Sequence, residues 1–203
     1  MESGNKHIKI AILISFACVS LTFLGSGVNA QENVSNTTST IMGKIDTTNW
    51  KNYSDPVYGL NIKYPGDWQS GNIGESLAFT SIINEGGGVF IINVMDIEKN
   101  ESIQNILRDR ILSLKSKDAS AVTTEPNKTK LANGVEIYQY QYTYTYSSGD
   151  PGKSLIAIAI DGGLKYFLEY AANSDTFDRN TLIIKTMINS FEPITFEFPE
   201  SAP

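Results

Sequence analysis

The chain has 203 residues and a formal net charge of −6, with 41% hydrophobic and 19% charged residues. This size and balance fit one ordinary globular domain, and they exclude a wholly disordered chain and a polytopic membrane protein. The only histidine is His7 and the only cysteine is Cys18, both in an N-terminal segment that we expect to be removed. A mature chain without them cannot form a Ser-His-Asp triad, a Cys-His nucleophile, a zinc finger, a haem attachment or a disulfide.

The first 30 residues have the pattern of a secretory signal peptide. Two lysines precede an apolar run at 10–24, and small residues then lead to a cleavage site after Ala30. The run is shorter than the roughly 20 apolar residues of a membrane-spanning helix, although an uncleaved segment 10–28 would tether the chain to the membrane. Cleavage removes the two lysines and Glu2, which takes the net charge from −6 to −7. We expect an exported, acidic protein that does not bind nucleic acid.

The segment 31–52 is rich in Ser, Thr and Asn and predicts a flexible stalk. One domain is expected at 53–194, followed by a tail at 195–203. Five Asn-x-Ser/Thr motifs are candidate N-glycosylation sites: Asn33, Asn36, Asn52, Asn100 and Asn127. All five fall in segments that we expect to be stalk or loop, as glycosylation requires.

Six runs with β-strand character follow the stalk, at 58–64, 77–83, 89–95, 135–146, 154–161 and 164–172. The run at 89–95 is apolar on both faces, which is typical of a central strand covered on both sides. Gly162-Gly163 separates the last two runs and favours a tight hairpin turn. With that turn, Ala157 is predicted to lie opposite Leu168.

Two amphipathic helices are predicted between and after the strands. The first, at 102–115, begins at the capping residue Ser102 and carries one apolar stripe. The second has its apolar face from Phe177 to Phe191, is expected to be capped by Asp175 or Ser174, and is ended by Pro193. The expected fold class is α+β, with an antiparallel sheet of about six strands sandwiched between helices.

A motif near the start of the domain carries a resemblance to a known family. Tyr53-x-Asp55 is followed by Tyr58-Gly59-Leu60-x-Ile62-x-Tyr64-Pro65-x-x-Trp68. This motif, and the layout of the whole region 50–194, resembles the PsbP family, the extrinsic proteins of photosystem II and their wider relatives. The resemblance implies an exported α-β-α sandwich that serves as an accessory or assembly subunit without enzymatic activity.

The chain departs from the photosystem members of that family in two respects. The segment before Tyr53 is neutral, whereas those members dock through basic N-terminal segments, and the mature chain lacks the histidine that some members use for metal contact. The resemblance is therefore carried to the fold and not to a role in oxygen evolution. Relatives in prokaryotes without photosystems are the better comparison.

Five tyrosines alternate along the run at 135–146 and form the candidate partner face: Tyr138, Tyr140, Tyr142, Tyr144 and Tyr146. Their spacing places all five rings on one face of a strand. They could form an aromatic platform for a sugar, a polymer or a partner protein, or they could cover the core beneath a helix.

Glu169 lies within an apolar strand and is the one candidate for a general acid, provided that a second carboxylate stands near it. Asp150, Asp161, Asp175 and Asp178 fall in turns or at a helix start, where capping explains them. No metal site or cofactor is expected, and calcium at a loop has no supporting motif.

Three functions are compatible with this sequence. The first is a non-catalytic exported module in a cell-envelope or surface protein complex. The second is a carbohydrate- or polymer-binding domain that uses the tyrosine face, and the third is a carboxylate-based hydrolase centred on Glu169.

Overall fold

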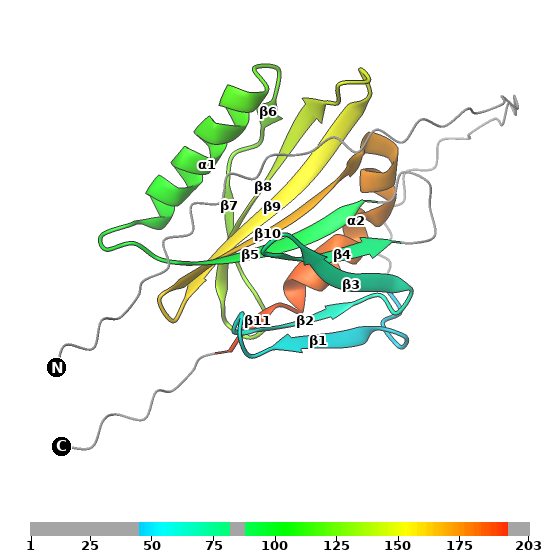
Figure 1. Ribbon diagram of the computed structural model, residues 1–203, viewed down its shortest axis with the longest axis vertical. Helices are drawn as coiled ribbons and strands as arrows, with labels where there is room; N and C mark the ends of the chain where they lie inside the picture. Colours follow the sequence, from blue (N-terminus) through cyan, green and yellow to red (C-terminus); the bar gives the residue numbers. More distant parts are fainter. Residues whose placement is uncertain (1–44, 82–87, 195–203) are drawn as a thin grey trace, which may run out of the picture. The chain divides into compact units, whose positions relative to one another are not determined.

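The computed structural model describes residues 45–81 and 88–194. Two antiparallel sheets and two helices make up this part of the chain (Figure 1). The larger sheet has eight strands and the smaller sheet has three. The antiparallel sheet with two helices is confirmed, and the expected number of about six strands is wrong.

The strands of the large sheet are, in chain order, β3 (Trp68–Ile73), β4 (Ser76–Ser81), β5 (Val89–Asp96), β6 (Val122–Thr123), β7 (Asn127–Lys130), β8 (Glu136–Thr145), β9 (Pro151–Asp161) and β10 (Leu164–Asn173). Those of the small sheet are β1 (Lys51–Asp55), β2 (Leu60–Tyr64) and β11 (Glu192–Pro193). The order of the strands is β3-β4-β5-β10-β9-β8-β6 in the large sheet, where β7 also pairs with β8, and β1-β2-β11 in the small sheet. The runs predicted at 58–64, 89–95, 135–146, 154–161 and 164–172 correspond to β2, β5, β8, β9 and β10. The end of the run at 77–83 lies outside the described residues, and its beginning corresponds to β4. β1 starts at Lys51, inside the segment expected to be stalk.

The hairpin of β9 and β10 has the predicted register. Ala157 lies opposite Leu168, and Ala159 lies opposite Tyr166. Gly162 and Gly163 connect the strands with φ values of 55° and 81°, a backbone region that glycine adopts without steric cost. The turn chemistry and the alternation of side chains therefore determine which residues of both strands face each side of the sheet.

Both helices occur where the sequence predicts them. α1 (Ile103–Lys117) begins after Ser102, whose hydroxyl accepts a hydrogen bond from the Asn105 N–H at 3.2 Å. α2 (Ser174–Asn189) is capped by Asn173, which accepts from the Thr176 N–H at 2.8 Å. The predicted caps of this second helix, Ser174 and Asp175, are wrong because both residues already lie within the helix.

Each helix packs on a different face of the large sheet (Figure 1). α1 places Ile106, Leu107 and Leu114 against tyrosines of β8 and isoleucines of β9. α2 packs with the other face, in one core that also contains Leu60, Ile62 and Tyr64 of the small sheet. The small sheet and α2 thus share one face of the large sheet, and α1 covers part of the opposite face.

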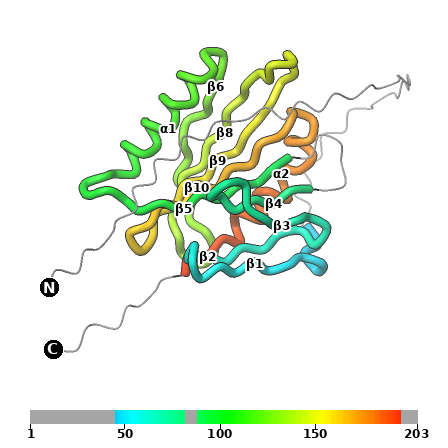
Figure 2. Tube along the Cα trace, in the orientation of Figure 1, coloured from blue at the N-terminus to red at the C-terminus, as the bar shows by residue number. Residues whose placement is uncertain are grey.

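The residues Tyr64-Pro65-x-x-Trp68 carry the chain from the small sheet into the large one, and the trace passes directly from β2 into β3 (Figure 2). The Trp68 N–H donates to the Pro65 carbonyl at 3.0 Å, which closes a turn. The Tyr64 ring packs on Phe79 at 4.8 Å between centroids, and Trp68 lies 6.3 Å from the Tyr170 ring. The motif that carries the family resemblance is therefore a structural joint with its aromatic side chains in the core.

Candidate functional site

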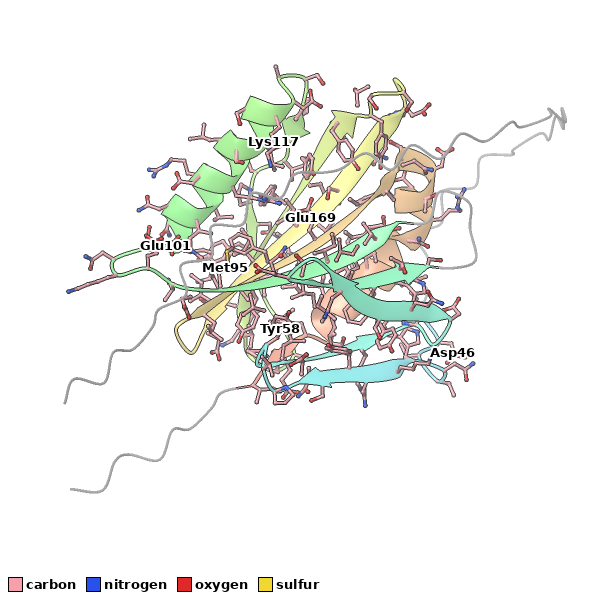
Figure 3. All side chains as sticks on the ribbon, viewed as in Figure 1. Asp46, Tyr58, Met95, Glu101, Lys117 and Glu169 are labelled. Carbon is pink, nitrogen blue, oxygen red and sulfur yellow. The ribbon has the colours of Figure 1, made fainter. Side chains whose placement is uncertain are left out.

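Glu169 of β10 lies in the layer between the sheet and α1, and its carboxylate accepts hydrogen bonds from three elements (Figure 3). Arg110 of α1 donates to Oε2 at 2.6 Å. Oε1 accepts from the Tyr142 hydroxyl at 3.1 Å and from the Ser154 hydroxyl at 3.0 Å. We call these four residues the Glu169 cluster. Both carboxylate oxygens are thus engaged in joining α1, β8, β9 and β10.

Arg110 is the cation of this cluster and is largely covered by protein, with 22% of its side chain exposed. Burial opposes its charge, but the neighbouring Glu169 carboxylate favours it, and the net effect is a raised pKa for Arg110. Burial also raises the pKa of the Tyr142 phenol, and the charge of Glu169 adds to this effect. At neutral pH the cluster therefore contains a charged guanidinium and neutral hydroxyls.

Two buried polar atoms have no hydrogen-bond partner among the described residues: Nε of Arg110, within the cluster, and the hydroxyl of Tyr140, next to it. Tyr140 is 2% exposed, and burial raises the pKa of its phenol although the charge of Arg110 lowers it. A buried hydroxyl without a partner is destabilising. The polar layer beneath α1 is therefore not fully satisfied by protein groups.

Tyr140 and Tyr142 offer a matched test of the hydrogen bonds in the polar layer beneath α1. Tyr142→Phe removes a hydrogen bond to a charged group and should lower the free energy of unfolding by about 1.5–3 kcal/mol. Tyr140→Phe removes a hydroxyl that lies beside Arg110 but has no hydrogen bond of ordinary geometry among the described residues, so it should change the free energy of unfolding by less than about 1 kcal/mol. Urea unfolding midpoints with unchanged m-values would measure both effects. Equal losses in the two variants would contradict this assignment of partners.

The structure places the candidate tyrosine face largely beneath α1. Tyr140 and Tyr142 are buried, Tyr138 and Tyr144 are half-buried against the same helix, and Tyr146 is 36% exposed. The hydroxyls of Tyr144 and Tyr146 share a hydrogen bond of 2.9 Å, and their rings lie 5.0 Å apart. Most of the aromatic area therefore covers the core, and Tyr146 at the end of β8 is the part that a partner can reach without displacement of α1.

A second ion pair holds the beginning of α1. Both carboxylate oxygens of Glu101, the residue before the cap, accept from Lys165 Nζ of β10 at 2.7 and 2.8 Å. Burial raises the pKa of Glu101. The hydrogen bond and the charge of Lys165, with a backbone hydrogen bond from Glu98, outweigh this effect, so the net pKa lies below its usual value. At the other end, Asp118 Oδ2 accepts from the Thr145 N–H at 3.3 Å. Polar contacts thus attach α1 to the sheet at its start, middle and end.

The remaining sequence candidates do not gather into one site. Asn52 lies in β1 and Asn127 in β7, which corrects their assignment to stalk or loop, and Asn100 lies between β5 and α1; all three are exposed. Asn33 and Asn36 lie outside the described residues. Within residues 45–81 and 88–194, no three acidic, histidine or cysteine side chains converge as metal ligands would. Asp178 pairs with Lys153 instead, at 2.7 Å.

A surface groove that the sequence does not reveal lies at the beginning of β1. We call it the Trp50 groove; its volume is about 610 Å³. Its walls come from the partly buried Ile45, Trp50 and Ile183 and from the buried Pro65. Its residues come from the start of the small sheet, the turn after β2, and α2, so no local sequence pattern could predict it. Neither this groove nor a smaller one along β1 and β2 is lined by Glu169.

The family model for PsbP matches residues 48–193, which span almost all of the described part of the chain. The chain belongs to the PsbP family. Among solved structures, the PsbP of the cyanobacterium Synechocystis has a TM-score of 0.59 and 14% identity. That match covers 75% of this chain and 98% of the cyanobacterial protein. The predicted resemblance is confirmed.

Solved structures of proteins from two other bacteria are also similar to this chain. LpqN of Mycobacterium tuberculosis, described as involved in cell envelope biogenesis, has a TM-score of 0.53 and 11% identity over 70% of this chain and 88% of its own. A Pseudomonas aeruginosa protein of unknown function has a TM-score of 0.52 and 9% identity, over 71% and 96%. No curated protein matches this PsbP-family chain in sequence. Within residues 45–81 and 88–194, no helix is long and apolar enough to cross a bilayer.

Proposed function

We propose that this PsbP-family protein is an exported, non-catalytic accessory module that binds a partner protein at the cell envelope. The engagement of Glu169 is the observation that supports this function most directly. The one carboxylate that could have served as a general acid is occupied by Arg110, Tyr142 and Ser154 in attaching α1 to the sheet. A glycosidase-type reaction needs a second carboxylate across a cleft, whereas the recorded contacts of Glu169 are a guanidinium and hydroxyls.

Family membership and the nature of its relatives support the same function. Membership of the PsbP family, which the sequence resemblance links to an accessory role, agrees with the description of the structurally similar LpqN as involved in cell envelope biogenesis. The sequence of residues 1–30 favours export, and the exposed positions of Asn52, Asn100 and Asn127 are compatible with glycosylation in a host that performs it.

Affinity capture of the full chain from its own cell envelope tests the proposed function. We expect one envelope protein to co-purify at a constant stoichiometry through size-exclusion chromatography, and the mature N-terminus to be Gln31. The chain with Glu169→Gln, assayed for turnover of glycosides and esters beside the unaltered chain, serves as the enzymatic control. Elution of the chain alone, or turnover that is lost in Glu169→Gln, would refute the proposal.

A further inference from the structure

The Trp50 groove combines an apolar interior with charged residues at its opening. Trp50 and Ile183 are partly buried and Pro65 is buried, whereas Asp46, Lys51 and Asp67 are exposed. Asp46 lies at the end of the molecule that holds β1, as labelled in Figure 3. The groove is open to solvent and has a volume of about 610 Å³. The groove can therefore accept a ligand that has both an apolar body and a polar end.

Two tight backbone contacts give this groove its form. The Trp50 N–H donates to the Thr47 carbonyl at 3.1 Å, which closes the turn before β1. Gly66, in the turn after β2, lies so close to that segment that an added Cβ would stand 2.1 Å from the Asn49 carbonyl oxygen. Because only glycine permits this approach, the two turns form a built wall and not an accidental hollow between mobile side chains.

The charged residues at the opening favour a cation. Asp46 Oδ1 accepts from the backbone N–H and the hydroxyl of Thr48, and these hydrogen bonds lower the pKa of Asp46. Both bonds end on Oδ1, so within the described part of the chain Oδ2 keeps its lone pairs for a ligand. Asp67 adds a second carboxylate and Lys51 one positive charge, which leaves a formal charge of −1 at the opening.

We infer that the Trp50 groove binds a long basic side chain, arginine or lysine, that a partner protein presents. This inference rests on the proposed function and names what the partner supplies. The aliphatic stem of such a side chain packs on Trp50, Pro65 and Ile183, and its cationic head meets the carboxylates at the opening. Tryptophan is also the best aromatic ring for a cation. Arginine is the better ligand because its planar guanidinium can bind a carboxylate through two hydrogen bonds.

The test uses the ¹⁵N-labelled full chain titrated with acetyl-Gly-Arg-Gly-amide, and a matched peptide in which uncharged citrulline replaces arginine. The chain has two tryptophans: the Trp50 indole N–H reports on the groove, and buried Trp68 reports on folding. We expect saturable shifts at the Trp50 indole and the Gly66 amide, with a dissociation constant in the millimolar range. The citrulline peptide should bind at least about tenfold more weakly.

Three variants test whether the charged residues at the opening of the groove determine the affinity for the arginine peptide. Asp46→Asn combined with Asp67→Asn should weaken arginine binding about tenfold or more, whereas Lys51→Met should tighten it about two- to threefold, since it removes a like charge. Asp96→Asn changes an exposed carboxylate of β5 outside the groove and should leave binding unchanged. The Trp68 signal must stay in place in each variant.

Several outcomes would overturn the inference. These are the absence of any shift at Trp50, equal binding of the citrulline peptide, and binding that is insensitive to Asp46 and Asp67. Shifts with a neutral oligosaccharide in place of the peptide would assign the groove to sugars. Failure of the proposed function is distinguishable, because the arginine peptide would still bind while no envelope protein co-purified. Conversely, if an envelope protein co-purified but the arginine peptide did not bind, the accessory function would stand and the Trp50 groove would be excluded as the binding site.

Discussion

Replacing Glu169 by alanine is expected to lower the free energy of unfolding by about 3–5 kcal/mol, because it leaves the charge of Arg110 largely buried without its partner. The carboxylate is 10% exposed and accepts bonds from Arg110, Tyr142 and Ser154. Its loss removes the acceptor of the guanidinium and of the Tyr142 hydroxyl, while Ser154 can still donate to the Tyr170 carbonyl at 2.8 Å. Equilibrium urea unfolding of the variant measures the loss.

Two further variants separate the charge from the contact area. Arg110→Met combined with Glu169→Leu removes both charges and keeps apolar volume, and such replacements of buried pairs are often neutral or stabilising. We therefore expect this double variant to recover most of the stability that Glu169→Ala loses. Asp178→Ala breaks an exposed pair with Lys153, whose side chains are 61% and 30% exposed, and should cost less than about 1 kcal/mol. A loss in Glu169→Ala no larger than in Asp178→Ala would show that the buried pair does not hold α1.

The hairpin register and the first helix could be predicted because their signals are local. Gly162-Gly163 sets the turn, and the alternation of side chains then determines each face of β9 and β10. Ser102 followed by one apolar stripe is sufficient for α1. The cap of α2 was less determined, since Asn173, Ser174 and Asp175 are three consecutive capping residues, and the choice among them depends on where β10 ends.

The strands missed by sequence analysis are short or polar. β3 contains Gln69 to Asn72 with no apolar alternation, and five of its six residues, from Gln69 to Ile73, are exposed. β6 and β11 have two residues each, and both exist through pairing with a longer strand. Edge strands of this kind are defined by the neighbour that hydrogen-bonds them and not by their own composition, so the predicted sheet was too small.

The candidate site shows the same division between local and long-range information. Period two correctly places Tyr138 to Tyr144 on one face of β8, but only the fold shows that α1 covers that face. The partner of Glu169 is 59 residues away. One signal could have found it, since Arg110 lies on the buried stripe of α1, four residues after Ile106 and four before Leu114. A charged residue at such a position needs a buried partner.

The second large effect is expected at alkaline pH. Burial is the largest cause of a raised pKa for six of the ten tyrosines: Tyr53, Tyr140, Tyr142, Tyr144, Tyr166 and Tyr170. For Tyr53, burial and the neighbouring carboxylate of Asp55 raise the pKa to about 12. Folding thus favours the protonated phenol, whose pKa in the unfolded chain is about 10. The stability that these six tyrosines contribute is fully present below pH 10, and it is lost as the pH rises through their pKa values in the folded chain.

The steepness of this loss follows from the number of protons that unfolding releases. Each buried tyrosine that ionises only in the unfolded chain lowers the free energy of unfolding by about 1.4 kcal/mol per pH unit. Tyr140 and Tyr142, which are 2% and 7% exposed, alone approach a slope of about 2.7 kcal/mol per pH unit. A domain with the usual stability of about 5–15 kcal/mol should therefore unfold within a few pH units above 10.

Urea unfolding at a series of pH values, read together with tyrosinate absorbance, measures this effect. Ionisation of the six tyrosines with a raised pKa should follow the loss of structure, with one shared midpoint above pH 10. Because lysines also lose their charge in this range, Tyr140→Phe combined with Tyr142→Phe is the control that isolates the phenols. That variant should lose less stability per pH unit above pH 10 than the unaltered chain. Ionisation of all ten tyrosines near pH 10 in a chain that remains folded would mean that α1 does not exclude water from the face of β8.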